Sequence, residues 1–184
     1  MDEIERVLKK FVMAMSRLEI PYVIVGGFAI AGWGRYRATQ DVDVIMQLRE
    51  TDVSGLVRVL REGGFSVKTE DILDALRQKE HFSIFNSDSI YHVDAKGVYG
   101  KHETRTLHSR VVIGIGDYSI PISGLEDTIV NKLRFGREQD IEDALAIFIR
   151  NKDKIDEAAL VSLCREYDVL RELRTLQRKA RRAE

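Results

Sequence analysis

Two aspartates that stand one residue apart, Asp41 and Asp43, are the part of the sequence best suited to chemistry. They alternate with Val42, Val44 and Met46, and this period of two predicts a strand with one polar face and one apolar face. Two neighbouring carboxylates repel each other, so a fold gains no stability by placing them side by side. A divalent cation removes this repulsion, and carboxylate oxygens suit Mg²⁺ or Mn²⁺. The pair therefore predicts a metal site on a strand.

A pair of glycines, Gly26 and Gly27, precedes these aspartates. The apolar run at residues 22–25 predicts a buried strand, and the glycines then predict a turn into a helix over about residues 28–33. Backbone N–H groups at the beginning of a helix attract phosphate. A phosphate site next to a metal site predicts an enzyme that handles nucleotides.

Two polar residues continue the alternation before the aspartate pair, and a third aspartate follows later in the chain. Arg37 and Thr39 share the period of two with the pair, so a strand that includes them would line up all four side chains. Asp94 lies in the alternating segment 91–95, which predicts a strand next to that of the pair. Three converging carboxylates can hold two cations about 3.5–4 Å apart, and Asp94 could also accept the proton of an attacking hydroxyl. The alternative is a solvated aspartate at a strand end.

A lysine on a later predicted helix is the fourth candidate. Lys132 lies one position from the apolar face of that helix, so its ammonium group would sit at the rim of a buried surface and could reach a triphosphate. Asp140 and Asp143 stand three residues apart on the next predicted helix and could hold Lys132 and Arg137 in place. The alternatives are an ordinary surface lysine and acidic residues that only favour the first turn of a helix.

The elements that would position these residues form a mixed pattern. Besides the segment of the aspartate pair, alternation or short apolar runs predict strands at 22–25, 65–67, 81–85, 90–95, 111–115 and 118–122. Helical periodicity predicts helices at 4–18, 53–60, 71–79, 123–133, 141–148, 157–167 and 169–180. The segment 101–110 has no periodicity and is expected to be a loop or part of a strand. The predicted fold class is α+β, with a mixed sheet and helices in residues 1–122 and a helical region in 123–184 packed on that core.

The composition is that of an ordinary globular chain. Of 184 residues, 44% are hydrophobic and 32% are charged, which argues against disorder. The net charge is −1, so any basic surface must be local; six Arg and Lys residues in 169–184 could contact RNA or form a solvated helix face. Cys164 is the only cysteine, which excludes an internal disulfide. No apolar run is long enough to span a membrane and no secretory signal opens the chain, so we expect a cytoplasmic protein.

Taken together, three motifs resemble the nucleotidyltransferase superfamily. They are Gly26-Gly27-Phe28-Ala29, then Arg37-x-Thr39-x-Asp41-x-Asp43, and Glu126-Asp127 through Lys132, Arg137 and Asp140. The sequence is similar to the AbiEii-type toxin nucleotidyltransferases of toxin–antitoxin and phage-defence systems. The resemblance implies a polymerase-β-like nucleotidyltransferase fold, an NTP substrate, Mg²⁺ or Mn²⁺, and transfer of a nucleotidyl group to RNA, such as tRNA, or to protein. The acceptor could also be a small molecule such as an aminoglycoside.

The resemblance also implies roles for single residues. Asp41, Asp43 and Asp94 would be the catalytic and metal-binding residues. The nucleotide-binding residues that it implies are Gly26, Gly27, Arg37, Thr39, Lys132 and Asp140. The four histidines show no metal-ligand spacing and receive no predicted role.

The chain departs from the superfamily at Phe28, where many members have a serine or threonine whose hydroxyl contacts phosphate. This departure favours a second hypothesis, a catalytically weak module of the same fold that binds a nucleotide or a partner protein. A third hypothesis is an antitoxin that acts on a partner toxin. Transfer of label from an NTP separates the enzyme from the binding module.

Overall fold

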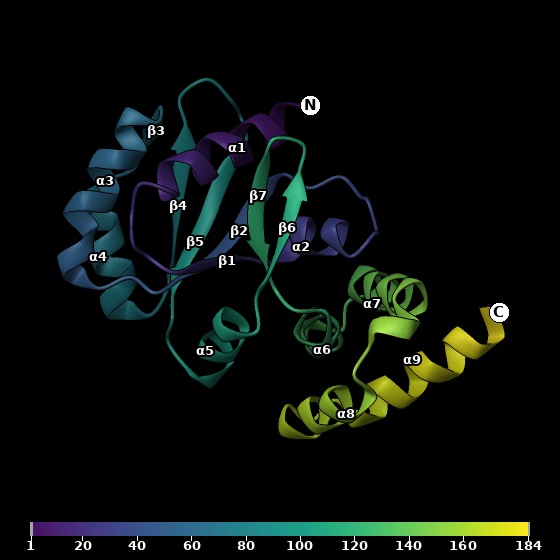
Figure 1. Cartoon of the computed structure of the whole chain (residues 1–184). Helices are drawn as coiled ribbons and strands as arrows, with labels where there is room; N and C mark the ends of the chain where they lie inside the picture. Colours follow the sequence, from purple (N-terminus) through teal and green to yellow (C-terminus); the bar gives the residue numbers. More distant parts are fainter. Residues whose placement is uncertain (1, 184) are drawn as a thin grey trace.

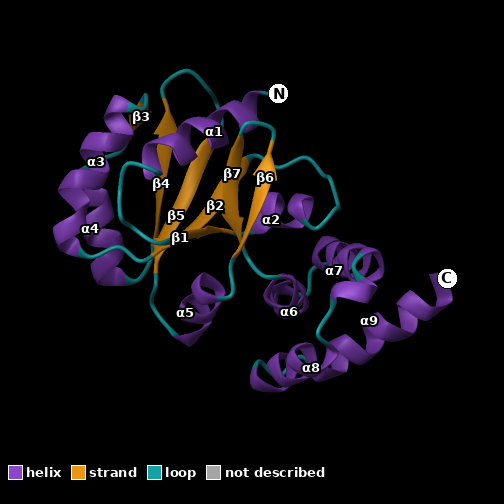
Figure 2. Ribbon diagram, viewed as in Figure 1, coloured by secondary structure: helices purple, strands orange, loops and turns teal. Residues whose placement is uncertain are grey.

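The computed structural model describes residues 2–183. Within this range, seven strands form one mixed sheet in the order β3-β4-β5-β2-β1-β7-β6. Figure 1 shows this sheet with helices packed around it, and Figure 2 shows that the C-terminal part is helical. The predicted fold class, a mixed sheet flanked by helices, is confirmed.

The strands are short and pair in both directions. They are β1 (Tyr22–Ile24), β2 (Asp41–Met46), β3 (Phe65–Ser66), β4 (His81–Asn86), β5 (His92–Gly97), β6 (Val111–Ile115) and β7 (Tyr118–Ile122). β2 runs parallel to β5 and antiparallel to β1, whereas β4 runs antiparallel to β5. β6 and β7, the strands that the sequence predicts at 111–115 and 118–122, pair antiparallel as a hairpin around Gly116.

The helices surround the sheet and then continue beyond it. They are α1 (Glu3–Met15), α2 (Gly26–Gly32), α3 (Val53–Glu62), α4 (Thr69–Gln78), α5 (Lys101–His108), α6 (Leu125–Phe135), α7 (Glu138–Arg150), α8 (Glu157–Glu166) and α9 (Leu170–Ala183), with short 3₁₀ turns at Glu50–Asp52 and Lys152–Lys154. α1 begins with a capping box, because the Glu5 backbone N–H donates to the Asp2 carboxylate and the Asp2 N–H donates to the Glu5 carboxylate. None of the helices within residues 2–183 is long and apolar enough to cross a membrane.

One face of the central strands is fully covered. Figure 1 shows α1 crossing the sheet, with α3 and α4 beside it. The side chains that these helices bury are every second residue of the central strands, namely Val42, Val44, Met46, Phe82, Ile84, Val93 and Ala95. Burial of this apolar face fixes the alternation, so the intervening polar residues must point to the other face.

The C-terminal helices have an apolar core of their own. Buried residues of α6, α7, α8 and α9 pack together, and Ile30 of α2 joins this second cluster. The cluster begins just after β7, where the sequence predicts a change from sheet to helix. The division into domains at residues 122 and 123 stays a prediction.

Two local predictions are wrong. Residues 101–110 contain the helix α5 rather than a loop or strand, and only Thr106 and Leu107 of that helix are buried, so it has no apolar period to detect. Arg37 and Thr39 precede β2 in a segment without regular structure, because the strand begins at Asp41.

Candidate active site

Three rows of side chains cross the polar face of β4, β5 and β2. The cross-strand register gives a first row of Phe85, His92 and Asp41, a second row of Ser83, Asp94 and Asp43, and a third row of His81, Lys96 and Ile45. Neighbouring rows are two residues apart along each strand, which corresponds to about 7 Å. Along the strand direction, the face therefore changes from a row with two aromatic side chains and one aspartate, to a row with two aspartates, and then to a row with a histidine and a lysine.

The three predicted aspartates lie on this one face. Asp43 and Asp94 stand directly opposite each other on the parallel strands β2 and β5, and Asp41 stands opposite His92. The Ser83 hydroxyl donates a hydrogen bond to Asp94 Oδ1 at 2.7 Å. The convergence of the aspartates is thus observed, whereas their catalytic and metal-binding roles stay predictions.

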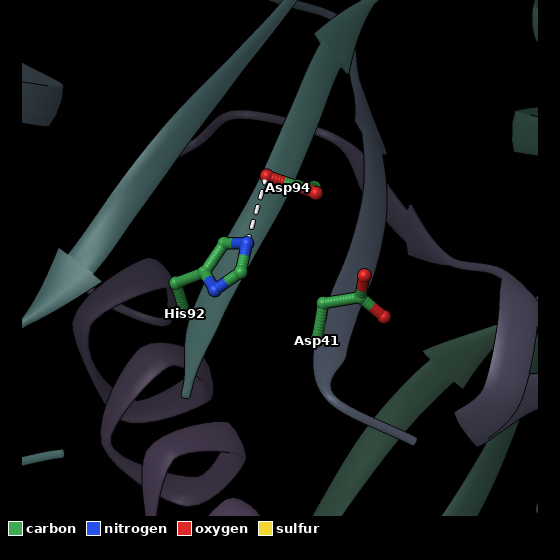
Figure 3. A group of neighbouring side chains, drawn as sticks. All are labelled: Asp41, His92 and Asp94. Carbon is green, nitrogen blue, oxygen red and sulfur yellow. Dashed lines mark ion pairs between the residues drawn. The ribbon is translucent and has the colours of Figure 1, made fainter. Parts of the chain in front are cut away.

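A histidine joins two of the aspartates in an arrangement that suits a cation. Among the described residues, one ligand atom each of Asp41, His92 and Asp94 lies within 4.8 Å of the others. Figure 3 shows the imidazole of His92 directed at Asp94, with Nε2 3.4 Å from Oδ1, and Asp41 on the neighbouring strand. Carboxylates suit Mg²⁺ and Mn²⁺, and imidazole is the commonest metal ligand, so this donor set fits a divalent cation.

Sequence reasoning missed His92. Its spacing of two residues from Asp94 could have placed it on the same face, but its position opposite Asp41 depends on the pairing of β5 with β2. Asp43 lies outside the trio, next to Gly26 at the beginning of α2.

The electrostatics around Asp43 are unfavourable without a cation. Burial, the largest cause, and the neighbouring Asp41 and Asp94 together raise the pKa of Asp43 to about 6, whereas Lys132 and Arg37 oppose this rise. A negative charge on Asp43 is therefore disfavoured first by burial and then by the neighbouring carboxylates. This is the conflict that a bound divalent cation would relieve.

The two glycines allow α2 to approach β2. A Cβ at Gly26, where φ is +60°, would collide with the Asp43 carboxylate, and a Cβ at Gly27 would lie 2.7 Å from Thr39 Oγ1. Thr39 in turn donates to Asp41 Oδ1 at 3.3 Å. Any larger residue would push the beginning of α2 away from the aspartates.

A cavity of about 390 Å³ extends from the acidic row toward the C-terminal helices. It is lined by Gly26, Asp43 and Ser123, and by the basic side chains of Arg37, Lys96, Lys132 and Arg137, together with residues of β4 and α5 to α7. The volume is in the usual range for a small-molecule site. A concave surface with several cations next to carboxylates is suited to a polyphosphate.

Lys132 is held in this cavity by two acidic residues of α7. Its Nζ is 2.6 Å from Asp140 Oδ1 and 3.3 Å from Asp143 Oδ2, and only 8% of the residue is exposed. The prediction that Asp140 and Asp143 hold Lys132 is confirmed. The same prediction for Arg137 is wrong, because Arg137 is exposed and has no ion pair among the described residues.

The buried Asp143 contacts arginines of the loop before β2 instead. Arg35 Nε lies 2.7 Å from Asp143 Oδ1 and Arg37 Nε lies 3.2 Å from Oδ2. A fully buried carboxylate needs such partners, since an unpaired buried charge is strongly unfavourable. Asp143 on α7 therefore links this loop to α6, because it contacts Arg35 and Arg37 of the loop and Lys132 of α6.

Solved structures resemble this chain, although neither a protein-family model nor a curated protein matches it. The solution structure of the antibiotic-resistance factor ANT(2'')-Ia is similar with a TM-score of 0.59 and 15% identity, covering 95% of this chain and 99% of that one. The crystal structure of ANT(2'')-Ia with adenylyl-2''-tobramycin gives 0.60 and 14%, covering 89% and 95%. An antigenic nucleotidyltransferase-like protein from Paracoccidioides brasiliensis gives 0.53 and 18%, covering 90% of each chain. The chain therefore shares the nucleotidyltransferase fold with these proteins.

Proposed function

We propose that this protein is a metal-dependent nucleotidyltransferase, which moves a nucleoside monophosphate from an NTP to an acceptor hydroxyl. The observation that carries the proposal is the sequence of charges on the polar face of the sheet. Acidic residues that suit a cation lie next to a cavity whose walls hold Arg37, Lys96, Lys132 and Arg137. An NTP bound to a divalent cation needs both surfaces side by side. The shared fold supports the same reading.

The proposed reaction is an in-line displacement at the α-phosphorus. The acceptor oxygen forms a bond to this phosphorus, the bond to the bridging oxygen of the β-phosphate breaks, and pyrophosphate leaves. The hydroxyl proton passes to the Asp94 carboxylate, which Ser83 orients by its hydrogen bond of 2.7 Å. The pyrophosphate moiety lies in the basic cavity, where Lys132 is held by Asp140 and Asp143.

Most of the rate acceleration in this reaction comes from positioning and from neutralisation of charge. Asp41 and Asp94, with His92 and the neighbouring Asp43, would hold a divalent cation, which would supply neutralisation of phosphate charge and activation of the attacking hydroxyl. Gly26, Gly27 and Thr39 would keep the beginning of α2 close enough for its backbone to approach the phosphates.

The finer assignment rests on the sequence motifs. Their similarity to AbiEii-type enzymes supports RNA, such as tRNA, or protein as the acceptor, and a role in a toxin–antitoxin system. The crystallised complex of the structural neighbour ANT(2'')-Ia holds an adenylylated tobramycin, which makes a small molecule the competing acceptor.

Transfer of radiolabel tests the proposal directly. The protein is incubated with each α-labelled NTP, Mg²⁺ or Mn²⁺, and total RNA, total cell protein or tobramycin, and the products are separated by electrophoresis or chromatography. We expect label in one acceptor class, and Asp41→Asn should reduce it by about 100-fold or more. Asp117→Asn, in the exposed turn between β6 and β7, is the matched control and should retain full activity.

Two results would contradict the proposal. Absence of label from every acceptor, with measurable NTP binding, would favour the binding module of the same fold. Equal activity of Asp41→Asn and the wild type would exclude the cation site of Asp41, His92 and Asp94 from the mechanism.

A further inference from the structure

The first row of the polar face has an exposed aromatic residue, Phe85, that the proposed nucleotide and cation sites do not use. Phe85 on β4 is 56% exposed, although it stands on the same face as the aspartates. Its ring centroid lies 5.6 Å from that of His92, with an angle of 32° between the two planes. The two rings are therefore tilted neighbours, and the Phe85 ring is the one that is largely exposed to solvent.

The order of the rows places the first row on the side of the proposed site from which the acceptor approaches. In-line displacement requires that the attacking and leaving oxygens lie on opposite sides of the phosphorus. The basic cavity at the third row would receive the pyrophosphate, and the second row holds Asp43 and Asp94. The attacking oxygen must then approach from the first row, which is where Phe85 and His92 lie.

The Phe85 end of the first row favours an uncharged planar group over a polycation. Phe85 carries no charge, and Asp88 in the nearby turn between β4 and β5 already pairs with Lys10 at 3.1 Å. A phenyl ring instead offers a π face, on which nucleobases stack whatever their sequence.

We propose that Phe85, next to the proposed cation ligand His92, forms a stacking platform for the acceptor, and that the acceptor is the terminal nucleoside of an RNA strand. The base stacks on Phe85, and the terminal ribose hydroxyl reaches the Asp94 carboxylate, toward which His92 points at 3.4 Å. Phe85 is thus a positioning residue for the acceptor. This inference rests on the proposed function, which supplies the reaction and the direction of attack.

The test compares two substitutions of one residue. Phe85→Leu keeps an apolar side chain but removes the ring, whereas Phe85→Trp keeps a ring. Val112→Ala, at a residue that is 68% exposed on β6, is the control for loss of exposed apolar surface. Thermal unfolding verifies that each variant is folded, as expected for exposed positions.

The first measurement is direct binding without chemistry. Fluorescence anisotropy follows a labelled, short single-stranded RNA with a free 3′ end in the absence of NTP. We expect Phe85→Leu to raise Kd by roughly 5- to 150-fold, the range that stacking of one base gives, and Phe85→Trp and Val112→Ala to stay close to the wild type. A wild type that does not bind this RNA, or a Phe85→Leu variant with unchanged Kd, would overturn the platform.

The second measurement distinguishes a role of Phe85 in binding the acceptor from a role in binding the NTP. With labelled NTP and the same RNA, Phe85→Leu should raise KM for the RNA by a similar factor and leave KM for the NTP unchanged. A change confined to kcat would mean that Phe85 only orients His92, and a raised KM for NTP would mean that the ring holds the base of the donor; either result refutes the inference. Transfer to tobramycin but not to RNA also refutes it. If the wild type labels no acceptor, the proposed function fails, and the binding measurement still decides the platform.

Discussion

Replacement of Asp43 by asparagine should stabilise the metal-free protein at neutral and alkaline pH. The Asp43 carboxylate is partly buried next to Asp41 and Asp94, and this environment raises its pKa from the ordinary value of 3.8 to about 6. The folded state therefore binds a proton that the unfolded state has already lost between these two pH values. As pH rises through this window the wild type loses stability, because the charged form is disfavoured only in the folded protein.

The magnitude follows from the size of the pKa shift. A rise of about 2 units corresponds to about 3 kcal/mol between folded and unfolded states at high pH. Because the side chain is not fully buried and water screens part of the repulsion, we expect a gain of about 2 kcal/mol for Asp43→Asn at pH 8. The gain should fall below about 1 kcal/mol at pH 4.5, where the carboxylate of the unfolded chain begins to bind protons too.

Urea unfolding followed by circular dichroism, in the presence of EDTA and over this pH range, measures the effect. Asp52→Asn is an informative comparison, because the Arg49 guanidinium holds the pKa of Asp52 below its usual value and the change in stability should have the opposite sign. Added Mn²⁺ should stabilise the wild type more than Asp43→Asn, because binding to the folded state alone adds to stability. An Asp43→Asn variant that is no more stable than the wild type at pH 8 would refute the inference that burial and the neighbouring aspartates disfavour the charged Asp43 carboxylate.

Two other substitutions address the neighbouring residues. Lys132→Met should lower the free energy of unfolding in urea titrations by about 3 kcal/mol, because Lys132 is the ion-pair partner observed for the buried Asp140. The same substitution should abolish NTP binding measured by calorimetry. A variant that unfolds at the wild-type urea concentration would contradict the predicted loss of stability. Gly26→Ala should cost at least about 1 kcal/mol and most of the transferase activity, since φ is +60° and the new Cβ meets the Asp43 carboxylate, whereas Gly55→Ala, at a position with free space around it, should be tolerated.

Local sequence patterns were sufficient for much of the fold. The alternation at Asp41 and Asp43 predicted which side chains of β2 share a face, because successive side chains of any strand point to opposite sides. The segments that bury a regular apolar face were also predicted, as in α1 and the β6–β7 hairpin. Prediction failed for α5, which buries too few residues to show a helical period, and for Arg37 and Thr39, whose alternation continues beyond the end of the strand.

The sequence by itself determined that carboxylates, glycines and a lysine suited to nucleotide chemistry occur on a mixed α+β chain. Only the tertiary structure decided which of them meet. Asp43 stands next to Asp94, and His92 next to Asp41, because β2 pairs in parallel with β5, which lies about fifty residues later in the chain. Such a register depends on the burial of the opposite face against α1, α3 and α4, and a shift by one residue would reverse every side chain. Likewise, Asp143 meets Arg35 and Arg37 only because α7 packs behind the loop before β2.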